Sequence, residues 1–381
     1  MPLADELAGL PLVDQHCHPV VLDPLDRPAF ELLLTEAHEG GPAGTSAFDS
    51  AAGLAVRRWC APALGLVPHA PIDDYLVRRD ELGSVEASRR LLAACGAVDL
   101  LVDTGLSAPG LCSAARFGEL AGARVHEVTR VEAVVEEVAA RGVDAARLGA
   151  AVVEELGSRA AGSVGFKTVA AYRVGLDLPA TAPGAAEVRR AADRWLAAAV
   201  VHGGERARFR LDDPVLIAHA VHTALSLGLP LQVHTGFGDP DLTLHRADPS
   251  LLTPLLRALP PEAGPIVLLH CYPYHRQAAY LAHAFPQVVL DLSLAVNHVG
   301  VRGAAVLAET LELAPFGSVL HGTDGFGLAE LHHLGAALLR QALGTVLEGW
   351  LAEDALTADD ALRLAGMIGA GNARRVYGLG G

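Results

Sequence analysis

Short apolar runs alternate with longer amphipathic runs along most of the chain. Eight short runs rich in Val, Leu and Ile predict β-strands, at residues 12–16, 98–103, 124–128, 163–168, 230–234, 266–270, 288–292 and 319–322. Several are almost continuously apolar, as expected of parallel strands that helices cover on both faces. Longer amphipathic runs predict helices, among them 185–201, 213–227, 249–258, 275–284, 302–313, 328–347 and 358–370.

This repeated strand–helix alternation is typical of one architecture. It predicts a single α/β domain over residues 1–381, folded as a (β/α)8 TIM barrel. A doubly wound sheet is the alternative, but no G-x-G-x-x-G sequence follows any of the predicted strands.

One interval is too long for a simple crossover. Residues 20–97, between the first and second predicted strands, contain amphipathic runs of their own at 27–38, 47–61 and 72–94. Turn-forming residues in "HEGGPAGTS" separate the first two runs. We expect residues 20–97 to form a helical cap over the mouth of the barrel.

Composition narrows the class of protein. Hydrophobic residues make up 51% of the chain and charged residues 19%, which is too apolar for a disordered chain. The formal charge of −15 argues against a nucleic-acid partner. The five cysteines include no C-x-x-C pair, and no apolar run approaches the roughly 20 residues that span a bilayer. We expect a soluble cytoplasmic protein with no membrane partner.

Polar side chains follow the predicted strands at their carboxyl ends, where catalysis takes place in barrels of this kind. His16 and His18 close the first strand, and residues i and i+2 of a strand share a face. His234 and His270 end the fifth and sixth strands, and Asp324 follows the eighth. One such histidine would be read as a core residue, whereas this many at one end of a barrel indicate a site.

Imidazoles and a carboxylate are suitable ligands for zinc or a similar divalent ion. We assign His16, His18, His234 and Asp324 as metal ligands. A bound ion lowers the pKa of its water to about 7, which gives hydroxide at neutral pH. Asp324 could also accept the water's proton and pass it to a leaving group. His270 is placed to polarise a carbonyl or to bridge to a second metal.

These residues lie in motifs that resemble a known family. "DQHCH", the histidines ending strands five and six, and the late aspartate resemble the amidohydrolase superfamily, and "GNARRVYGL" is similar to the end of its amidohydrolase-related (family 2) branch. "FKTVAAYRVGL", "HTGFGDPDL", "LLHCYPYHRQAAYLAHAFPQVVLDLSLA" and "GFGLAELHHLG" resemble the amidohydrolase domain of nodulin and glutamine-synthetase-like fusion proteins. The resemblance covers most of residues 10–378.

The resemblance implies a barrel hydrolase that uses one or two divalent ions, zinc above all, and acts on C–N bonds. We expect metal-bound hydroxide to cleave an amide-type bond of a small, carboxylate-bearing substrate. A non-oxidative decarboxylase on the same ligands is the alternative. A non-catalytic small-molecule binder is a third reading, which predicts missing ligands, and none is missing here.

The resemblance also bears on partners. It makes a homodimer possible, since dimers are common in that family. The chain ends at Gly381 without a glutamine-synthetase-like domain. Any coupling to glutamine metabolism would therefore require a separate glutamine-synthetase-like protein.

Lys167, in the fourth strand, has two readings. In many members of the superfamily a carboxylated lysine at this strand bridges two metals and so takes part in catalysis. Where one metal suffices, a free lysine can bind a substrate carboxylate. Its place directly after "VGF" in a predicted core strand disfavours a solvated surface residue.

Further residues on the same rim are candidates for substrate binding. Arg173, next to Tyr172, suits bidentate recognition of a carboxylate, although a helix-surface arginine is an open alternative. Glu36, in "LLLTEAHEG", resembles a "SEA"-type motif of the family and could point into the pocket, with a solvated helix face as the open alternative. The remaining candidates are His298, Tyr274 and His275, the last two of which could instead simply begin a helix. Cys17 and Cys271 are expected to pack on the opposite face, and His202 to be an ordinary helix residue.

Overall fold

The computed structural model describes residues 3–106, 108–201 and 209–380, so that His202 lies outside the described residues. Seven strands form one sheet in sequence order, and every neighbouring pair is parallel. They are β1 (Leu12–Cys17), β2 (Ala97–Asp103), β3 (Arg124–Arg130), β4 (Ser163–Thr168), β5 (Leu231–His234), β6 (Ile266–Leu269) and β7 (Val288–Leu290). The seven match the first seven predicted strands to within two residues at each end.

The eighth predicted strand, 319–322, is not a strand. The Leu320 N–H donates to the Leu290 carbonyl of β7 (2.9 Å), and the Gln15 N–H of β1 donates to the His321 carbonyl (2.9 Å). One hydrogen bond on each side is too few for a ladder, but it joins both edges of the sheet to the same segment. The sheet therefore curls until its edges meet on residues 319–322, which gives a TIM-barrel-like α/β fold.

Apolar packing follows from this curl. Val13, Leu101, Val267 and Val289, from four different strands, belong to one buried cluster with Tyr377 near the C-terminus. Strands so far apart in the sheet can share a cluster only inside the curl. Two larger clusters join the outer face of the sheet to the helices. Burial on both faces explains why the strands read as continuous apolar runs.

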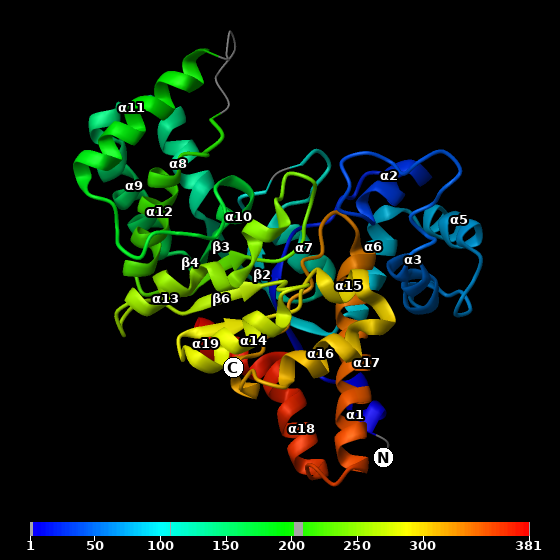
Figure 1. Ribbon diagram of the computed structural model, residues 1–381. Coiled ribbons are helices and arrows are strands. Elements are labelled where there is room, and N and C mark those ends of the chain that lie inside the picture. The colour runs from blue at the N-terminus through cyan, green and yellow to red at the C-terminus, as the bar shows by residue number, and fades with distance from the viewer. Residues whose placement is uncertain (1–2, 107, 202–208, 381) are drawn as a thin grey trace.

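Helices surround the sheet (Figure 1). Those outside the β1–β2 interval are α1 (Leu3–Ala8), α7 (Ala114–Ala121), α8 (Val131–Ala140), α9 (Ala145–Ala160), α10 (Ala170–Arg173), α11 (Ala185–Val201), α12 (Pro214–Ser226), α13 (Thr253–Ala258), α14 (His275–Ala284), α15 (Ala295–Val299), α16 (Gly303–Leu311), α17 (Ala329–Ala352), α18 (Ala358–Gly366) and α19 (Asn372–Tyr377). The predicted helices 185–201 and 275–284 have the observed bounds. The predicted helix 249–258 begins instead with a 3-10 turn, Pro249–Leu252.

The β1–β2 interval holds α2 (Arg27–Leu33), α3 (Ala51–Ala55), a π-helical turn (Val56–Cys60), α4 (Ala61–Ala63), α5 (Ile72–Leu82) and α6 (Ser84–Ala94). The predicted helix 72–94 is divided at Gly83, whose φ of 76° glycine adopts readily. The predicted helix 27–38 ends at Leu33. Beyond it the Thr35 hydroxyl donates to the Leu32 carbonyl and accepts from the Ala37 N–H, which competes with helical bonding.

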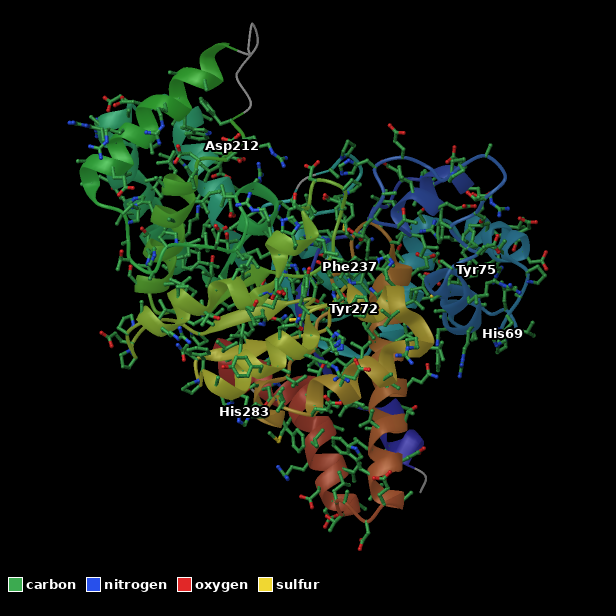
Figure 2. All side chains as sticks on the ribbon, in the orientation of Figure 1. His69, Tyr75, Asp212, Phe237, Tyr272 and His283 are labelled. Atoms are coloured by element: carbon green, nitrogen blue, oxygen red, sulfur yellow. The ribbon has the colours of Figure 1, made fainter. Side chains whose placement is uncertain are left out.

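A buried ion pair joins the β1–β2 interval to the start of α17. Arg79 Nε of α5 lies 2.8 Å from Glu330 Oε1 at the start of α17, and the Tyr75 hydroxyl donates to the same oxygen (2.9 Å; Figure 2 labels Tyr75). All three side chains are buried. Glu330 therefore has a structural role.

The state of the cysteines and the length of the apolar helices bear on two further expectations. The five cysteines are free, and Cys17 and Cys271 are buried in packing as expected. Within the described ranges, no helix combines the length and apolarity needed to cross a membrane.

Candidate metal centre and substrate pocket

The end of β1 and the turn after residue 323 meet at one carboxylate. The Asp324 N–H donates to the His16 carbonyl (2.8 Å), and a φ of 50° turns its side chain inward. Asp324 Oδ1 then lies 3.0 Å from His16 Nε2 and 3.3 Å from His18 Nε2. The pairing of β1 with β2 shifts register between Asp14 and Cys17. Despite this irregularity, the Nε2 atoms of both histidines face the same carboxylate oxygen.

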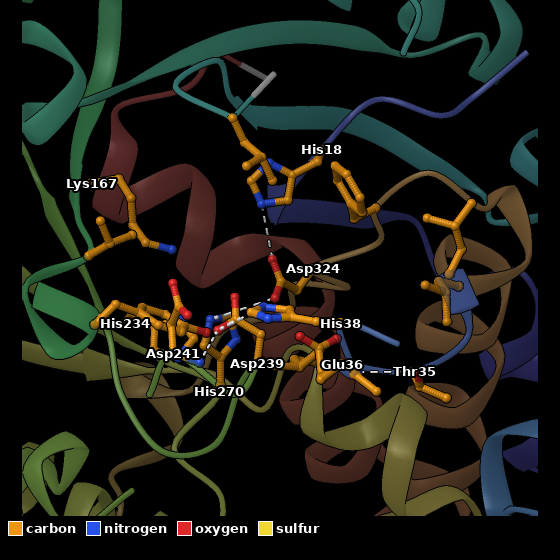
Figure 3. A pocket seen from close by; sticks show the side chains of 18 of the residues that line it. His18, Thr35, Glu36, His38, Lys167, His234, Asp239, Asp241, His270 and Asp324 are labelled. Atoms are coloured by element: carbon orange, nitrogen blue, oxygen red, sulfur yellow. Dashed lines mark hydrogen bonds and ion pairs between the residues drawn. The ribbon is translucent and has the colours of Figure 1, made fainter. Parts of the chain in front are cut away.

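Two more histidines, at the end of β5 and directly after β6, lie near this carboxylate (Figure 3). His270 Nε2 is 3.7 Å from Asp324 Oδ2, and the ring centroids of His234 and His270 are 4.5 Å apart. Ligand atoms of His16, His270 and Asp324 all lie within 4.8 Å of one another. The structure thus brings the four predicted ligands to one place and adds His270.

These residues fit a divalent ion. His16 Nδ1, His234 Nε2 and His270 Nε2 are buried without a hydrogen-bond partner among the described residues. Burial lowers the pKa of His16 to about 4, and it lowers the pKa values of His234 and His270 well below the usual value. Burial opposes ionisation of Asp324, but the facing His270 and His16 hold its pKa well below its usual range. Neutral imidazoles around a carboxylate are a donor set typical of zinc and related ions.

The orientation of His270 is set by its neighbours. Ser293 Oγ donates to Asp291 Oδ1 (2.8 Å), so its lone pair accepts from His270 Nδ1–H (2.8 Å). Asp291 Oδ1 also accepts from the His270 backbone N–H (2.7 Å). This tautomer leaves a lone pair on Nε2, which suits a metal ligand.

Lys167 lies inside the centre, since only 2% of the residue is exposed. Its Nζ is 3.0 Å from His16 Nε2. Burial lowers the pKa of Lys167 to about 8, although Asp103 and Asp324 oppose the shift. A solvated surface lysine is therefore wrong, and both predicted functional readings stay open.

A cavity of about 440 Å³ opens above the centre, and His18, His234, His270, Lys167 and Asp324 all line it. Its wall differs from place to place. Arginines come from the ends of β3 and α10 and from the segment before α12 (Arg130, Arg173, Arg210). Apolar side chains come from α2 and from the segments after β7 and residue 324 (Leu32, Leu33, Leu294, Phe326, Leu331). Acidic groups stand at Glu36, Asp239 and Asp241.

The predicted rim residues divide into two groups. Tyr172, Arg173 and Glu36 line the cavity, and the Tyr172 ring lies 4.5 Å from that of His234. His298 is not among the residues that line the cavity, but its Nε2 lies 3.6 Å from Oε1 of Glu36, which does line it. His298 and His275 line a neighbouring pocket.

Tyr274 and His275 do not line the cavity, so their assignment to it is wrong. The Tyr274 hydroxyl donates to the Leu244 carbonyl (3.3 Å), and His275 Nε2 faces Glu309 Oε2 (2.7 Å). Both stand at the start of α14, whose first turn leads away from the centre.

Sequence reasoning missed several cavity residues. Arg130 is the last residue of β3, just as His16 lies near the end of β1. A search for polar residues at the carboxyl ends of all the strands would therefore have found Arg130. Asp239 and Asp241 lie in "HTGFGDPDL", close after His234. Arg210 lies in no strand and carries no comparable signal.

Comparison with known proteins gives one family. A family model described as Amidohydrolase matches residues 13–379. Among curated proteins, Protein fluG of Emericella nidulans is 34% identical over 228 residues, which cover 57% of this chain and 26% of that protein. The match thus spans about a quarter of the length of that relative.

Solved structures match over nearly the whole chain. A Lactobacillus casei protein provisionally described as a metal-dependent hydrolase has a TM-score of 0.84 at 27% identity, covering 99% of this chain and 97% of that one. Uronate isomerases of Bacillus halodurans (TM-score 0.66, 13% identity, coverage 99% and 96%) and Thermotoga maritima (TM-score 0.61, 15% identity, coverage 98% and 96%) share the fold.

Proposed function

The chain belongs to the Amidohydrolase family, and on that premise we propose that it is a metal-dependent hydrolase that cleaves an amide-type C–N bond of a small, carboxylate-bearing substrate. The observation that carries the proposal is the set of imidazole nitrogens that face the Asp324 carboxylate, namely His16 Nε2 at 3.0 Å, His18 Nε2 at 3.3 Å and His270 Nε2 at 3.7 Å, the last of which is buried without a hydrogen-bond partner among the described residues. Unpaired polar atoms are costly in a protein interior unless a ligand satisfies them. His16, His18, His234, His270 and Asp324 would hold the ion, and zinc is the ion that this donor set favours.

A divalent ion at this place supplies Lewis acidity, which acidifies water and polarises a carbonyl. The protein's own groups handle the proton. Asp324, anionic near neutral pH, accepts a proton from the attacking water and passes it to the leaving amine. We assign His270 to the ion rather than to an oxyanion, because its Nδ1–H is already given to Ser293. Lys167, carboxylated by CO2, would help to hold the ions, or as a free amine it would bind a substrate carboxylate.

The architecture is part of the proposal. We treat residues 1–381 as one (β/α)8 unit in which residues 319–322 take the place of the eighth strand. Residues 20–97 act as a helical cap, since Leu32, Leu33 and Glu36 line the cavity. Closeness to the amidohydrolase domain of nodulin and glutamine-synthetase-like fusion proteins is in keeping with the partial match to Protein fluG. The homodimer, the separate glutamine-synthetase-like partner and the cytoplasmic location stay predictions.

The test compares metal content and products in wild type and two histidine variants. His234→Ala should lose bound metal and turnover of carboxylate-bearing amides. His222→Ala, on α12 with its Nε2 facing the Pro179 carbonyl, is the control and should keep both. Release of ammonia or amine supports hydrolysis, whereas release of CO2 instead would identify a decarboxylase. Full turnover by metal-free protein would refute both.

A further inference from the structure

Three guanidinium groups gather at one part of the cavity wall. Arg130 is held by Asp103, with Nη2 2.6 Å and Nε 3.1 Å from Oδ2. Arg210 Nη2 lies 2.9 Å from Asp241 Oδ2. Arg173 stands with them in the lining of the same cavity. The three come from separate parts of the chain, so their convergence is a property of the fold.

Arg173 differs from the other two because its charge is poorly satisfied. Its side chain is 13% exposed, and its nearest carboxylate, Glu136 Oε1, is 3.6 Å from Nη2. That oxygen already accepts the Leu211 N–H (2.7 Å). Arg173 Nη1 is buried without a hydrogen-bond partner among the described residues. Burial and the neighbouring Arg210 lower the pKa of Arg173, which shows that the protein leaves this cation under-compensated.

Burial of a guanidinium whose N–H donors lack acceptors destabilises the folded protein. An anion that accepts hydrogen bonds from these N–H groups would remove this free-energy cost. The chain itself places such an anion close to the reacting groups. Arg173 follows Tyr172, whose ring lies 4.5 Å from His234. Arg173 lines the same cavity as His234 and Asp324, so a group bound by Arg173 would share that cavity with the metal centre.

The far wall has the opposite character. Leu294 follows β7, and Phe326 and Leu331 follow the segment that closes the sheet, whereas Arg130 and Arg173 follow β3 and β4. In a closed sheet these two groups of strands face each other across the mouth. The cavity therefore has its arginines on one side, together with the apolar Leu106 and Val169, and Leu294, Phe326 and Leu331 on the other.

We propose that the carboxylate-bearing ligand of this cavity also carries an apolar body, with its carboxylate held by Arg173 and Arg210 and its body by Leu294, Phe326 and Leu331. The reaction at this ligand rests on the proposed function, but the binding does not. A planar carboxylate fits the guanidinium fork. Asp103 and Asp241 already pair with Arg130 and Arg210, which leaves Arg173 as the poorly compensated cation, so a single negative charge is favoured over a phosphate dianion.

Acidic groups also stand at the mouth of the cavity, and one of them, Asp241, is paired with Arg210. Glu36 Oε1 is 3.6 Å from His298, and Asp239 Oδ1 is 3.8 Å from His38. They define the competing outcome, in which a cationic ligand binds better than an anionic one.

Calorimetric titration with four probes tests the proposal: 4-methylpentanoate, 4-methylpentanamide, isoamylamine and inorganic phosphate. We expect the acid to bind at least about tenfold more tightly than the isosteric amide, as for loss of one charged hydrogen bond of about 1.4 kcal/mol. Tighter binding of the amine or of phosphate, or no binding of the acid at millimolar concentration, would overturn the proposal.

Variants locate the site. Arg173→Met and Arg210→Met should each weaken acid binding about tenfold or more, while Arg363→Met, on the exposed face of α18, should not change it. Arg210 is 56% exposed, so its variant keeps the test valid if Arg173→Met fails to fold. Acid binding that survives in both variants but is lost in His234→Ala would make the metal the anchor and refute the arginine site. Arginine-dependent binding without hydrolysis would refute the proposed function alone.

Discussion

The Ser293→Ala variant tests whether Ser293 fixes the orientation and the tautomer of the His270 ring. Ser293 Oγ accepts from His270 Nδ1–H and donates to Asp291 Oδ1, each at 2.8 Å, and all three residues are completely buried. Removing the hydroxyl leaves Nδ1–H without an acceptor. It also frees the imidazole to adopt the other tautomer, in which Nε2 carries the proton and no longer offers a lone pair.

The size of the effect can be worked out in two ways. A buried donor left unsatisfied costs about 1–3 kcal/mol. Loss of the hydrogen bond that orients a metal-binding histidine costs about 10–100-fold in metal affinity or activity, which is about 1.4–2.7 kcal/mol. The two agree, so we expect Ser293→Ala to weaken metal binding 10–100-fold.

A competitive titration with a chromophoric chelator measures the metal affinity, and urea unfolding measures stability alongside it. Ser88→Ala is the matched control, because Ser88 is equally buried on α6 and its Oγ has no hydrogen-bond partner among the described residues. Its metal affinity should equal that of wild type. A metal affinity within about threefold of wild type in Ser293→Ala would refute the orienting role (a threefold change is about 0.65 kcal/mol, below the lower bound).

Three further predictions concern stability and the pocket. Arg79→Met leaves buried Glu330 without its ion pair, which should cost about 3–5 kcal/mol in urea unfolding; a loss below 1 kcal/mol would contradict this. Burial lowers the pKa of His321 to about 4. Between pH 6.5 and 4, His321 is therefore protonated in the unfolded chain but neutral in the folded chain. This group should therefore remove up to about 3 kcal/mol of stability between pH 6.5 and 4, in addition to what His16, His234 and His270 remove, and a fall in His321→Asn as large as in wild type would exclude His321 as a source. A Cβ at Gly238 would lie 1.8 Å from Tyr172 Oη, so Gly238→Ala should displace that ring from His234 and lower metal affinity, and unchanged affinity would count against the contact.

The sequence allowed the centre to be predicted because its residues obey a local rule. His16, His18 and His234 come at or just after the end of an apolar strand, and parallel strands bring such ends together. The prediction needed no knowledge of the helices.

The errors arose where tertiary context overrides the local pattern. Residues 319–322 are apolar enough for a strand, but they bond to Leu290 and Gln15 once each and form no ladder. Gly83 interrupts a run whose periodicity is helical throughout. Tyr274 follows a strand as His270 does, yet it caps the start of α14 and does not line the cavity. Arg210 enters the cavity from a segment with no periodic signal, so only the fold reveals it.

Anomalous diffraction from crystals of the protein grown with zinc, recorded on both sides of the zinc absorption edge, tests the central claim most directly. We expect an anomalous peak between His16, His234, His270 and Asp324, and none in Asp324→Ala. A fully loaded ion elsewhere in the chain, with this cluster empty, would contradict it.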